Sequence, residues 1–337
     1  MSGALRRRWA ALVALCGRRE PAHGLALFRI AVGLSMLYAL ISMAWSGLDQ
    51  VFWVDTADGG MFDHRPDHWL LAALGGRTAA VIGGLVPVGI GLAVCVTLGL
   101  GGRPVLLCAG QVYQALVRAG PLVTGGYDLL IGDALWLLLL AGASRSLSLD
   151  ARIRRGTWAP AIDIAAWPRY LAIFQILTVY TTTGLHKQGP PWTPIGGFSA
   201  LYWVFQEPTW RRFDLSFTAS VYPLTQIATA VTWLWEISAL LLLVFYYYRE
   251  TAERPGRIRA WMQRRDLRVA FVAIGVPLHL GILILLNVGP FSLISLAYYL
   301  CLWHPDELAR GGRRLLRVTP AVDKGGAAPA ADGGPRP

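Results

Sequence analysis

Eight stretches of the chain are long and predominantly apolar, and they define the expected architecture. A helix needs about 20 mostly apolar residues to cross a bilayer, and each stretch meets or approaches that length. The third and fourth are short, and a turn sequence beginning at Asn287 separates the last two. The pattern therefore predicts an all-α protein, a polytopic transmembrane helix bundle of about eight spans. The stretches cover residues 25–45, 78–100, 104–119, 129–143, 162–185, 219–246, 269–286 and 291–303.

Arginines cluster in alternate connecting segments, and this predicts the orientation of the bundle. They gather in the first 20 residues and after the fourth, sixth and eighth stretches, whereas the loop after the first stretch contains Asp55, Asp58, Asp63 and Asp67. Short loops rich in Lys and Arg stay on the cytoplasmic side of a membrane. With eight spans, every arginine-rich segment falls on one side. We therefore expect a multi-pass protein of the cell membrane with both termini in the cytoplasm.

The same pattern divides the chain into three parts. Residues 1–20 are expected to be a basic cytoplasmic N-terminus, 21–305 the transmembrane domain, and 306–337 a basic and then disordered tail. The first apolar stretch is as long as a full span, so it is interpreted as a retained helix and not as a signal peptide. The aromatic-rich segment 193–210 is predicted to be an interfacial or re-entrant helix.

Composition agrees with a membrane protein and argues against other classes. Only 15% of the 337 residues are charged and 55% are hydrophobic, whereas soluble proteins carry about 25% charged residues. The net charge of +11 comes from loop arginines, so no nucleic-acid partner is expected. The four cysteines form no C-x-x-C pair, which indicates neither a disulfide framework nor a zinc site. His64 and His68 lie among aspartates, but Pro66 spoils helical ligand spacing, and no metal site is predicted.

Lys187 is the strongest candidate for chemistry. The chain has only two lysines, and the other is Lys324 in the predicted tail. A guanidinium cannot lose its proton in a protein, whereas a desolvated ammonium can. Lys187 is therefore a candidate general base, and the alternative is a lysine that only anchors a helix end. Tyr180 and Thr183 precede it at helical spacing, which predicts one polar face.

Two ionisable residues fall within predicted spans. Glu236 lies in the sixth span and His279 in the seventh. Such residues are costly in a bilayer and mark either a functional site or a buried structural partner. Arg29 and Arg169 are possible partners for Glu236, although both lie toward the other end of the bundle. Further polar candidates lie at the outer ends of the spans, namely Asp128, Asp133 and Asn287.

One run of residues resembles a known family. It comprises Arg169 to Gln175, Tyr180, Gly184-Leu-His-Lys187, Trp192 and the pair Gly196-Gly197. Together with segments beginning at Phe28, Phe52, His279 and Gly289, it is similar to the vitamin K-dependent gamma-glutamyl carboxylases. It is equally similar to the bacterial membrane proteins that share their transmembrane core, the horizontally transferred transmembrane (HTTM) family. The resemblance covers roughly residues 20–305 and implies a bacterial inner-membrane protein.

This resemblance implies specific roles. In the carboxylases the lysine that matches Lys187 deprotonates vitamin K hydroquinone, and the histidine that matches His279 lies at the active site. The cofactor would then be a quinone or hydroquinone. Tyr127 stands where the carboxylases have a histidine, and too few residues follow the last span for their large extracytoplasmic domain. Carboxylation of a protein substrate is therefore not expected.

The leading hypothesis is a membrane protein with an outward-facing intramembrane cavity that binds a quinone or another small apolar ligand. Lys187 would be the base and His279 a second catalytic residue in carboxylase-like or oxidoreductase chemistry. The alternative is a non-enzymatic membrane protein that assists maturation or export of a secreted peptide. A transporter would show inverted repeats, and none is evident. The residues expected to line the cavity or bind the ligand are Tyr180, Glu236, Tyr127, Asp128, Trp192 and Asn287.

Overall fold

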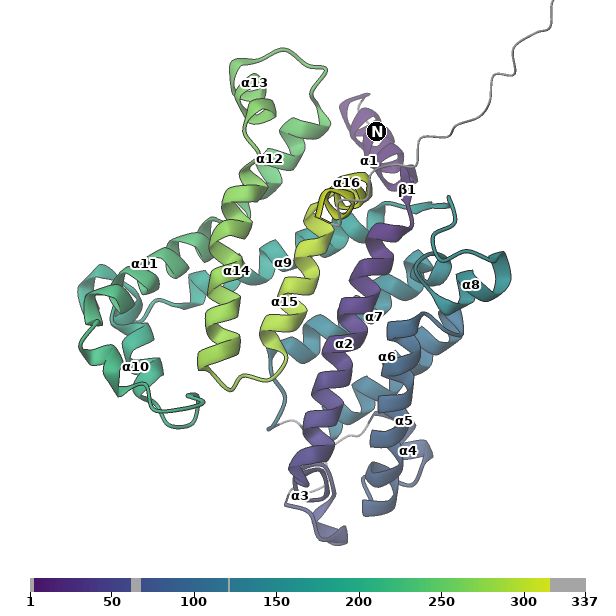
Figure 1. Ribbon diagram of the computed structural model, residues 1–337, viewed down its shortest axis with the longest axis vertical. Helices are drawn as coiled ribbons and strands as arrows, with labels where there is room; N and C mark the ends of the chain where they lie inside the picture. The colour runs from purple at the N-terminus through teal and green to yellow at the C-terminus, as the bar shows by residue number, and fades with distance from the viewer. Residues whose placement is uncertain (1–2, 62–67, 121, 316–337) are drawn as a thin grey trace, which may run out of the picture.

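A computed structural model describes residues 3–61, 68–120 and 122–315, and it is predominantly helical (Figure 1). One set of helices follows the apolar stretches. They are α2 (His23–Ser46), α5 (Ala79–Leu98), α6 (Gly102–Ala119), α7 (Gly126–Ala141), α9 (Trp167–His186), α11 (Tyr222–Ser238), α12 (Leu241–Glu250), α14 (Leu267–Leu285) and α15 (Phe291–Tyr299).

The other helices occupy the segments between and beyond the apolar stretches. The α-helices among them are α1 (Gly3–Gly17), α3 (Asp49–Phe52), α4 (Trp69–Ala73), α8 (Leu149–Arg155), α10 (Ala200–Gln206), α13 (Arg257–Arg264) and α16 (Pro305–Leu315). The 3-10 turns are η1 (Thr56–Asp58), η2 (Ala143–Arg145), η3 (Pro190–Trp192), η4 (Pro194–Gly196), η5 (Ser216–Ala219) and η6 (Leu300–Leu302). The predicted interfacial helix over 193–210 is thus a chain of turns followed by the short α10.

Three of the described helices are long and apolar enough to cross a membrane, namely α2, α5 and α14. The pair α11 and α12 would provide a fourth span, but the two are bent by 48° at the break between them. The remaining helices are shorter or less apolar. The three apolar helices expose many large apolar side chains, and only 22% of the most apolar 18 residues of α14 are buried. Soluble proteins rarely expose so much contiguous apolar surface.

The bundle is built around α2. This helix packs against α5, α7 and α15, while α9 packs against α11 and α14 against α15. Phe28, Val32 and Met36 of α2 are fully buried, and the ring of Phe28 meets the ring of Tyr298 at 4.9 Å between centroids. The helices α1, α13 and α16 lie at one end of the molecule and α3 and α4 at the other (Figure 1). We call these the arginine end and the aspartate end.

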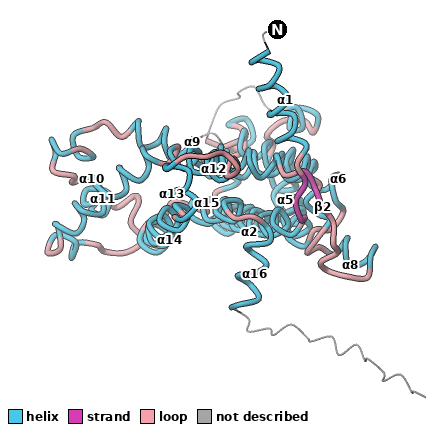
Figure 2. The backbone as a smooth tube through the Cα atoms, turned by 90° about the horizontal axis from the view of Figure 1, so that it is seen from above, coloured by secondary structure: helices cyan, strands magenta, loops and turns pink. Residues whose placement is uncertain are grey.

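A two-stranded antiparallel ribbon adds an element that the all-α prediction did not include. Strand β1 (Arg19–Pro21) pairs with β2 (Asp163–Ala165), with Glu20 opposite Ile164. The ribbon ends at the starts of α2 and α9 and lies at the edge of the helices when the molecule is seen from above (Figure 2). It therefore fixes the arginine ends of two helices that are remote in sequence.

Candidate functional site

Lys187 and Glu236 form a short ion pair. The Lys187 Nζ donates to both carboxylate oxygens of Glu236 at 2.5 Å. The lysine side chain is 20% exposed and the glutamate side chain 9%. The Nζ also lies 4.5 Å from the centre of the Trp192 ring. Three of the predicted site residues thus come together, and the partner of Glu236 is Lys187, in place of Arg29 or Arg169.

A glycine explains why these two side chains meet. A Cβ atom at Gly184 would lie 2.8 Å from the Cβ of Glu236 and 2.8 Å from the Ile237 backbone nitrogen. Only a glycine therefore lets α9 approach α11 this closely at the turn before Lys187. Helix α9 ends at His186, and Lys187 follows with a non-helical ψ of 60°. The end of the helix releases the lysine side chain toward α11.

Glu236 lies in the last turn of α11, just before the chain bends into α12. The bend frees a backbone amide, and Leu240 donates this N–H to the Thr181 hydroxyl at 3.0 Å. The sequence predicted one continuous span here, and the structure breaks it. Broken helices at membrane depth require such substitute partners, and they are a common feature of intramembrane binding sites.

Tyr180 and His279 form a second, deeper pair. The Tyr180 hydroxyl lies 2.7 Å from His279 Nε2 and 3.2 Å from the Tyr299 hydroxyl. His279 is 1% exposed, and its Nδ1 has no hydrogen-bond partner among the described residues. The predicted polar face of α9 is thus only partly correct, because Thr183 lies exposed while Tyr180 is buried. The hydroxyl–imidazole contact can pass a proton between the two rings.

Aromatic rings connect the two pairs. Trp235 precedes Glu236, and its ring centre is 4.6 Å from that of Tyr180. The same indole stacks on Phe271 at 4.6 Å and donates its N–H to the Phe271 carbonyl at 3.0 Å. The Tyr180–His279 pair therefore lies within a packed aromatic cluster, and Glu236 follows a member of this cluster in the sequence.

The other predicted site residues line cavities at the aspartate end. The largest, which we call the outer cavity, has a volume of about 540 Å³ and is lined by Tyr127, Trp210, Asn287 and Phe291 among others. A smaller cavity of about 200 Å³ shares Tyr127 with it and includes Asp128. The Asp128 carboxylate accepts hydrogen bonds from the Tyr113 hydroxyl at 2.5 Å and from the Gly125 amide at 2.8 Å.

An apolar cavity of about 330 Å³ separates α10, α11 and α14, and it shares Ile282 and Leu286 with the outer cavity. Lys187, Glu236, Tyr180 and His279 line none of these three cavities. The nearest link is Phe291, because its ring lines the outer cavity and lies 5.6 Å from the His279 ring. The predicted site residues therefore form two neighbouring groups. One consists of the Lys187–Glu236 and Tyr180–His279 pairs, and the other of the residues that line the cavities at the aspartate end.

Asp133 belongs to neither group. Its carboxylate accepts a hydrogen bond from Gln175 at 2.5 Å. Residues 62–67, which include His64 and the aspartates beside it, lie outside the described residues. The neighbouring His68 caps α4 by accepting a hydrogen bond from the Leu70 amide. In the described part of the chain, no three His, Cys, Asp or Glu side chains gather in a way that could hold a metal ion.

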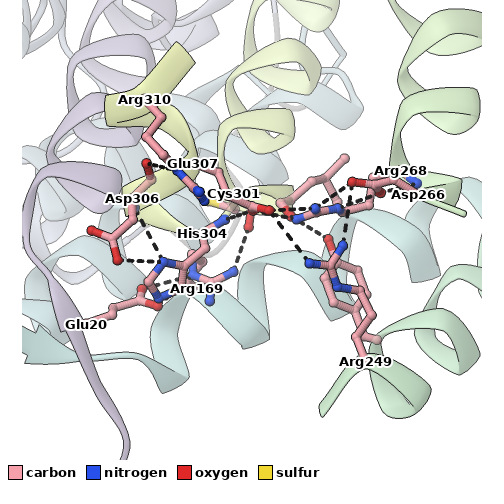
Figure 3. Close-up of polar contacts among 12 residues, drawn as sticks. Glu20, Arg169, Arg249, Asp266, Arg268, Cys301, His304, Asp306, Glu307 and Arg310 are labelled. Atoms are coloured by element: carbon pink, nitrogen blue, oxygen red, sulfur yellow. Dashed lines mark hydrogen bonds and ion pairs between the residues drawn. The ribbon is translucent and has the colours of Figure 1, made fainter. Parts of the chain in front are cut away.

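A buried ionic network at the arginine end was not predicted (Figure 3). Arg169 donates to both Glu20 carboxylate oxygens at 2.8 and 2.9 Å and to the Cys301 carbonyl at 3.1 Å. Burial raises the pKa of Glu20, although the Arg169 charge opposes this. Residues 149 positions apart cannot be paired from one sequence, and the only available signal was an arginine at the start of an apolar stretch.

The second half of this network is centred on Arg268. Its guanidinium donates to Glu307 at 2.7 and 2.9 Å and to Asp266 at 2.7 and 2.9 Å (Figure 3). The hydrogen bonds from Arg268 lower the pKa of Glu307 to about 2. The network therefore joins β1, α9, α14 and α16 at the arginine end. Each of its carboxylates named here accepts hydrogen bonds from Arg169 or Arg268.

Comparison with known proteins does not extend these observations. No protein-family model, no curated protein and no solved structure matches the chain.

Proposed function

We propose that this protein is a multi-pass membrane protein that transfers a proton to or from an apolar, quinone-like ligand at the Lys187–Glu236 pair. The arginine end would face the cytoplasm and the aspartate end the opposite side, with the shorter helices completing about eight spans. The single observation that carries the proposal is the 2.5 Å contact between the only described lysine and a carboxylate inside an apolar helix.

The proposed step needs only the side chains at the pair. Lys187 passes a proton to the Glu236 carboxylate, and the neutral amine then takes the phenolic proton of the ligand. The products are a protonated Glu236, an ammonium and a ligand phenolate that the ammonium stabilises. Burial disfavours the charged forms of both groups and so favours such a transfer, and an arginine could not take part because its pKa is too high.

The surroundings support an apolar aromatic ligand. The Trp192 ring covers the ammonium and offers a flat surface for a second ring. The outer cavity and the apolar cavity have volumes within the range of small-molecule sites, which is about 300–1,000 Å³. Phe291 is the contact between the outer cavity and His279, so rotation of one ring would open a route to the Tyr180–His279 pair.

A non-enzymatic function is the second candidate, and one observation favours it. Lys187 and Glu236 satisfy each other and line none of the three cavities at the aspartate end. In that case the ion pair would only hold α9 against α11. The outer cavity would then take an apolar side chain of a secreted peptide during its maturation or export.

The test uses the purified full chain and a naphthohydroquinone as the probe. Nuclear magnetic resonance reports the rate at which the bound probe exchanges its phenolic proton with water, and quenching of tryptophan fluorescence reports binding. We expect the wild-type protein to raise this exchange rate and Lys187→Arg to abolish the increase, because an arginine keeps the charge beside Glu236 but cannot act as the base. The variant should remain folded because arginine can keep the ion pair with Glu236.

The matched control is Arg211→Lys, an exchange of one cation for another in the pair of the half-buried Arg211 with the exposed Asp214. This control variant should affect the probe as the wild-type protein does. If Lys187→Arg raises the exchange rate of the probe as much as the wild type does, the lysine is not the base and the second candidate is favoured.

A further inference from the structure

A separate cavity lies at the arginine end, remote from the site described above. Its volume is about 400 Å³. It is formed by the start of α6, the end of α7 and the short helix α8, which lies at the edge of the molecule in both views (Figures 1 and 2). Its lining residues are Gly102, Arg103, Gly142, Ser144, Arg145, Asp150, Ala151, Arg154 and Arg155.

The charge of this lining is strongly positive. The lining has four arginines and a single carboxylate, that of Asp150, which already accepts the Gly101 amide at 3.1 Å. Within the described ranges, no carboxylate lies within 4.0 Å of any of the four guanidinium groups. The first turn of α6 also lines the cavity, and the N-terminus of a helix favours an anion. The cavity therefore has unused donors for an oxyanion, and guanidinium groups bind phosphate with paired hydrogen bonds.

An apolar path leads out of the cavity along the helices. Leu107 follows Arg103 by one turn on α6 and is 44% exposed. On α7, Leu140 is 54% exposed and Trp136 lies exposed one turn further along. Arg103 donates to the Leu140 carbonyl at 3.2 Å, so the two helices meet where this path begins. A free phosphate ion would make no favourable contact with such an apolar surface, whereas an acyl chain would cover it.

Helix α8 has the features of a segment at a membrane surface. Ile153 lies exposed among its arginines, and Trp158 lies exposed just beyond its end. Arginines near an apolar and an indole side chain are typical of the region of lipid headgroups.

We infer that this cavity binds the phosphate headgroup of an anionic phospholipid, with the acyl chains lying along Leu107, Leu140 and Trp136. Basic cavities between helices at the cytoplasmic side are known sites for anionic lipids. The inference depends on the placement of the chain in a membrane but not on any chemistry at Lys187.

The experiment is native mass spectrometry of the full chain in a mild detergent. Phosphatidylglycerol is the probe, phosphatidylcholine the neutral comparison and glycerol 3-phosphate the soluble comparison. We expect Arg103→Gln with Arg154→Gln to weaken binding of phosphatidylglycerol at least tenfold, on the basis of about tenfold for every 1.4 kcal/mol and about 1 kcal/mol per arginine. Both side chains are exposed, so the fold should tolerate the change.

The matched control removes the same charge from α13, where Arg257 and Arg264 lie exposed. Arg257→Gln with Arg264→Gln should leave the affinity within twofold. A second variant, Leu107→Gln with Leu140→Gln, should weaken binding of the lipid but not of glycerol 3-phosphate.

Three results would overturn the inference. The control pair could weaken binding as much as the cavity pair, which would indicate a general effect of net charge. Phosphatidylcholine could bind as tightly as phosphatidylglycerol. Glycerol 3-phosphate could displace the lipid at equal concentration, which would indicate a site for a soluble phosphate.

Discussion

The Glu20–Arg169 pair gives the sharpest prediction about stability. Both side chains are at least 95% buried. Arg169→Met would leave the Glu20 carboxylate and the Cys301 carbonyl without their donor. Removing one member of a buried ion pair costs about 3–5 kcal/mol. Since 1 kcal/mol corresponds to about 2 °C for larger domains, the melting temperature should fall by roughly 6–10 °C.

The prediction extends to the double variant and to pH. Glu20→Leu with Arg169→Met removes both charges, so most of the lost stability should return. In Arg169→Met alone, burial raises the pKa of Glu20 with no cation to oppose it. A carboxyl group whose folded pKa is raised destabilises the fold as pH rises above its unfolded value. The deficit of the single variant should therefore be smaller at pH 5 than at pH 8.

The assay is a thermal melt followed by tryptophan fluorescence in detergent. Arg211→Met is the control, because Arg211 pairs with the exposed Asp214 and exposed pairs contribute about 0–1 kcal/mol. A loss of less than 2 °C in Arg169→Met, or a double variant less stable than either single variant, would refute the reasoning.

Three further predictions concern the helix contacts and the ionic network. Gly184→Ala should destabilise the fold by about 1–3 kcal/mol because the added methyl overpacks the contact with α11. Gly91→Ala is the control, because the added methyl would meet no other atom within 4 Å. It should be neutral or stabilising in the same thermal melt. Thr181→Val should cost about 1–3 kcal/mol because it removes the acceptor of the amide freed at the bend, and hydrogen exchange should show faster opening there. Glu307→Gln should lower the melting temperature near pH 7. The difference in melting temperature between this variant and the wild type should shrink as pH falls from 4.5 toward 2, because Arg268 keeps the folded pKa of Glu307 below its unfolded value. A difference that does not change with pH would contradict this role.

The helices could be predicted because their signal is local. Most apolar stretches correspond to one helix within a few residues, the stretch 219–246 being divided into α11 and α12, since length and hydropathy along the chain determine where a helix can form in an apolar environment. The ribbon of β1 and β2 could not be predicted, because its three-residue strands carry no pattern and depend on a remote partner. The bend between α11 and α12 contains no proline or glycine, so no residue there predicts it.

The site was predicted residue by residue but not as an arrangement. Lys187 and Glu236 each stood out because a charge near or within an apolar stretch is costly. Their pairing depends on how α9 and α11 are aligned, and Gly184 determines this through a contact that has no local signature. His279 was predicted as a companion of Lys187, yet its hydrogen-bond partner is Tyr180. The roles of these residues in chemistry stay predictions.

The ribbon also has a consequence for biosynthesis. Glu20 and Arg169 are separated by 149 positions, and ribosomes add about 5–20 residues per second. Arg169 is therefore synthesised roughly 7–30 s after Glu20. During that interval α2, α5, α6 and α7 emerge while the carboxylate stays in water, and its burial is a late event that closes the first half of the chain onto the second.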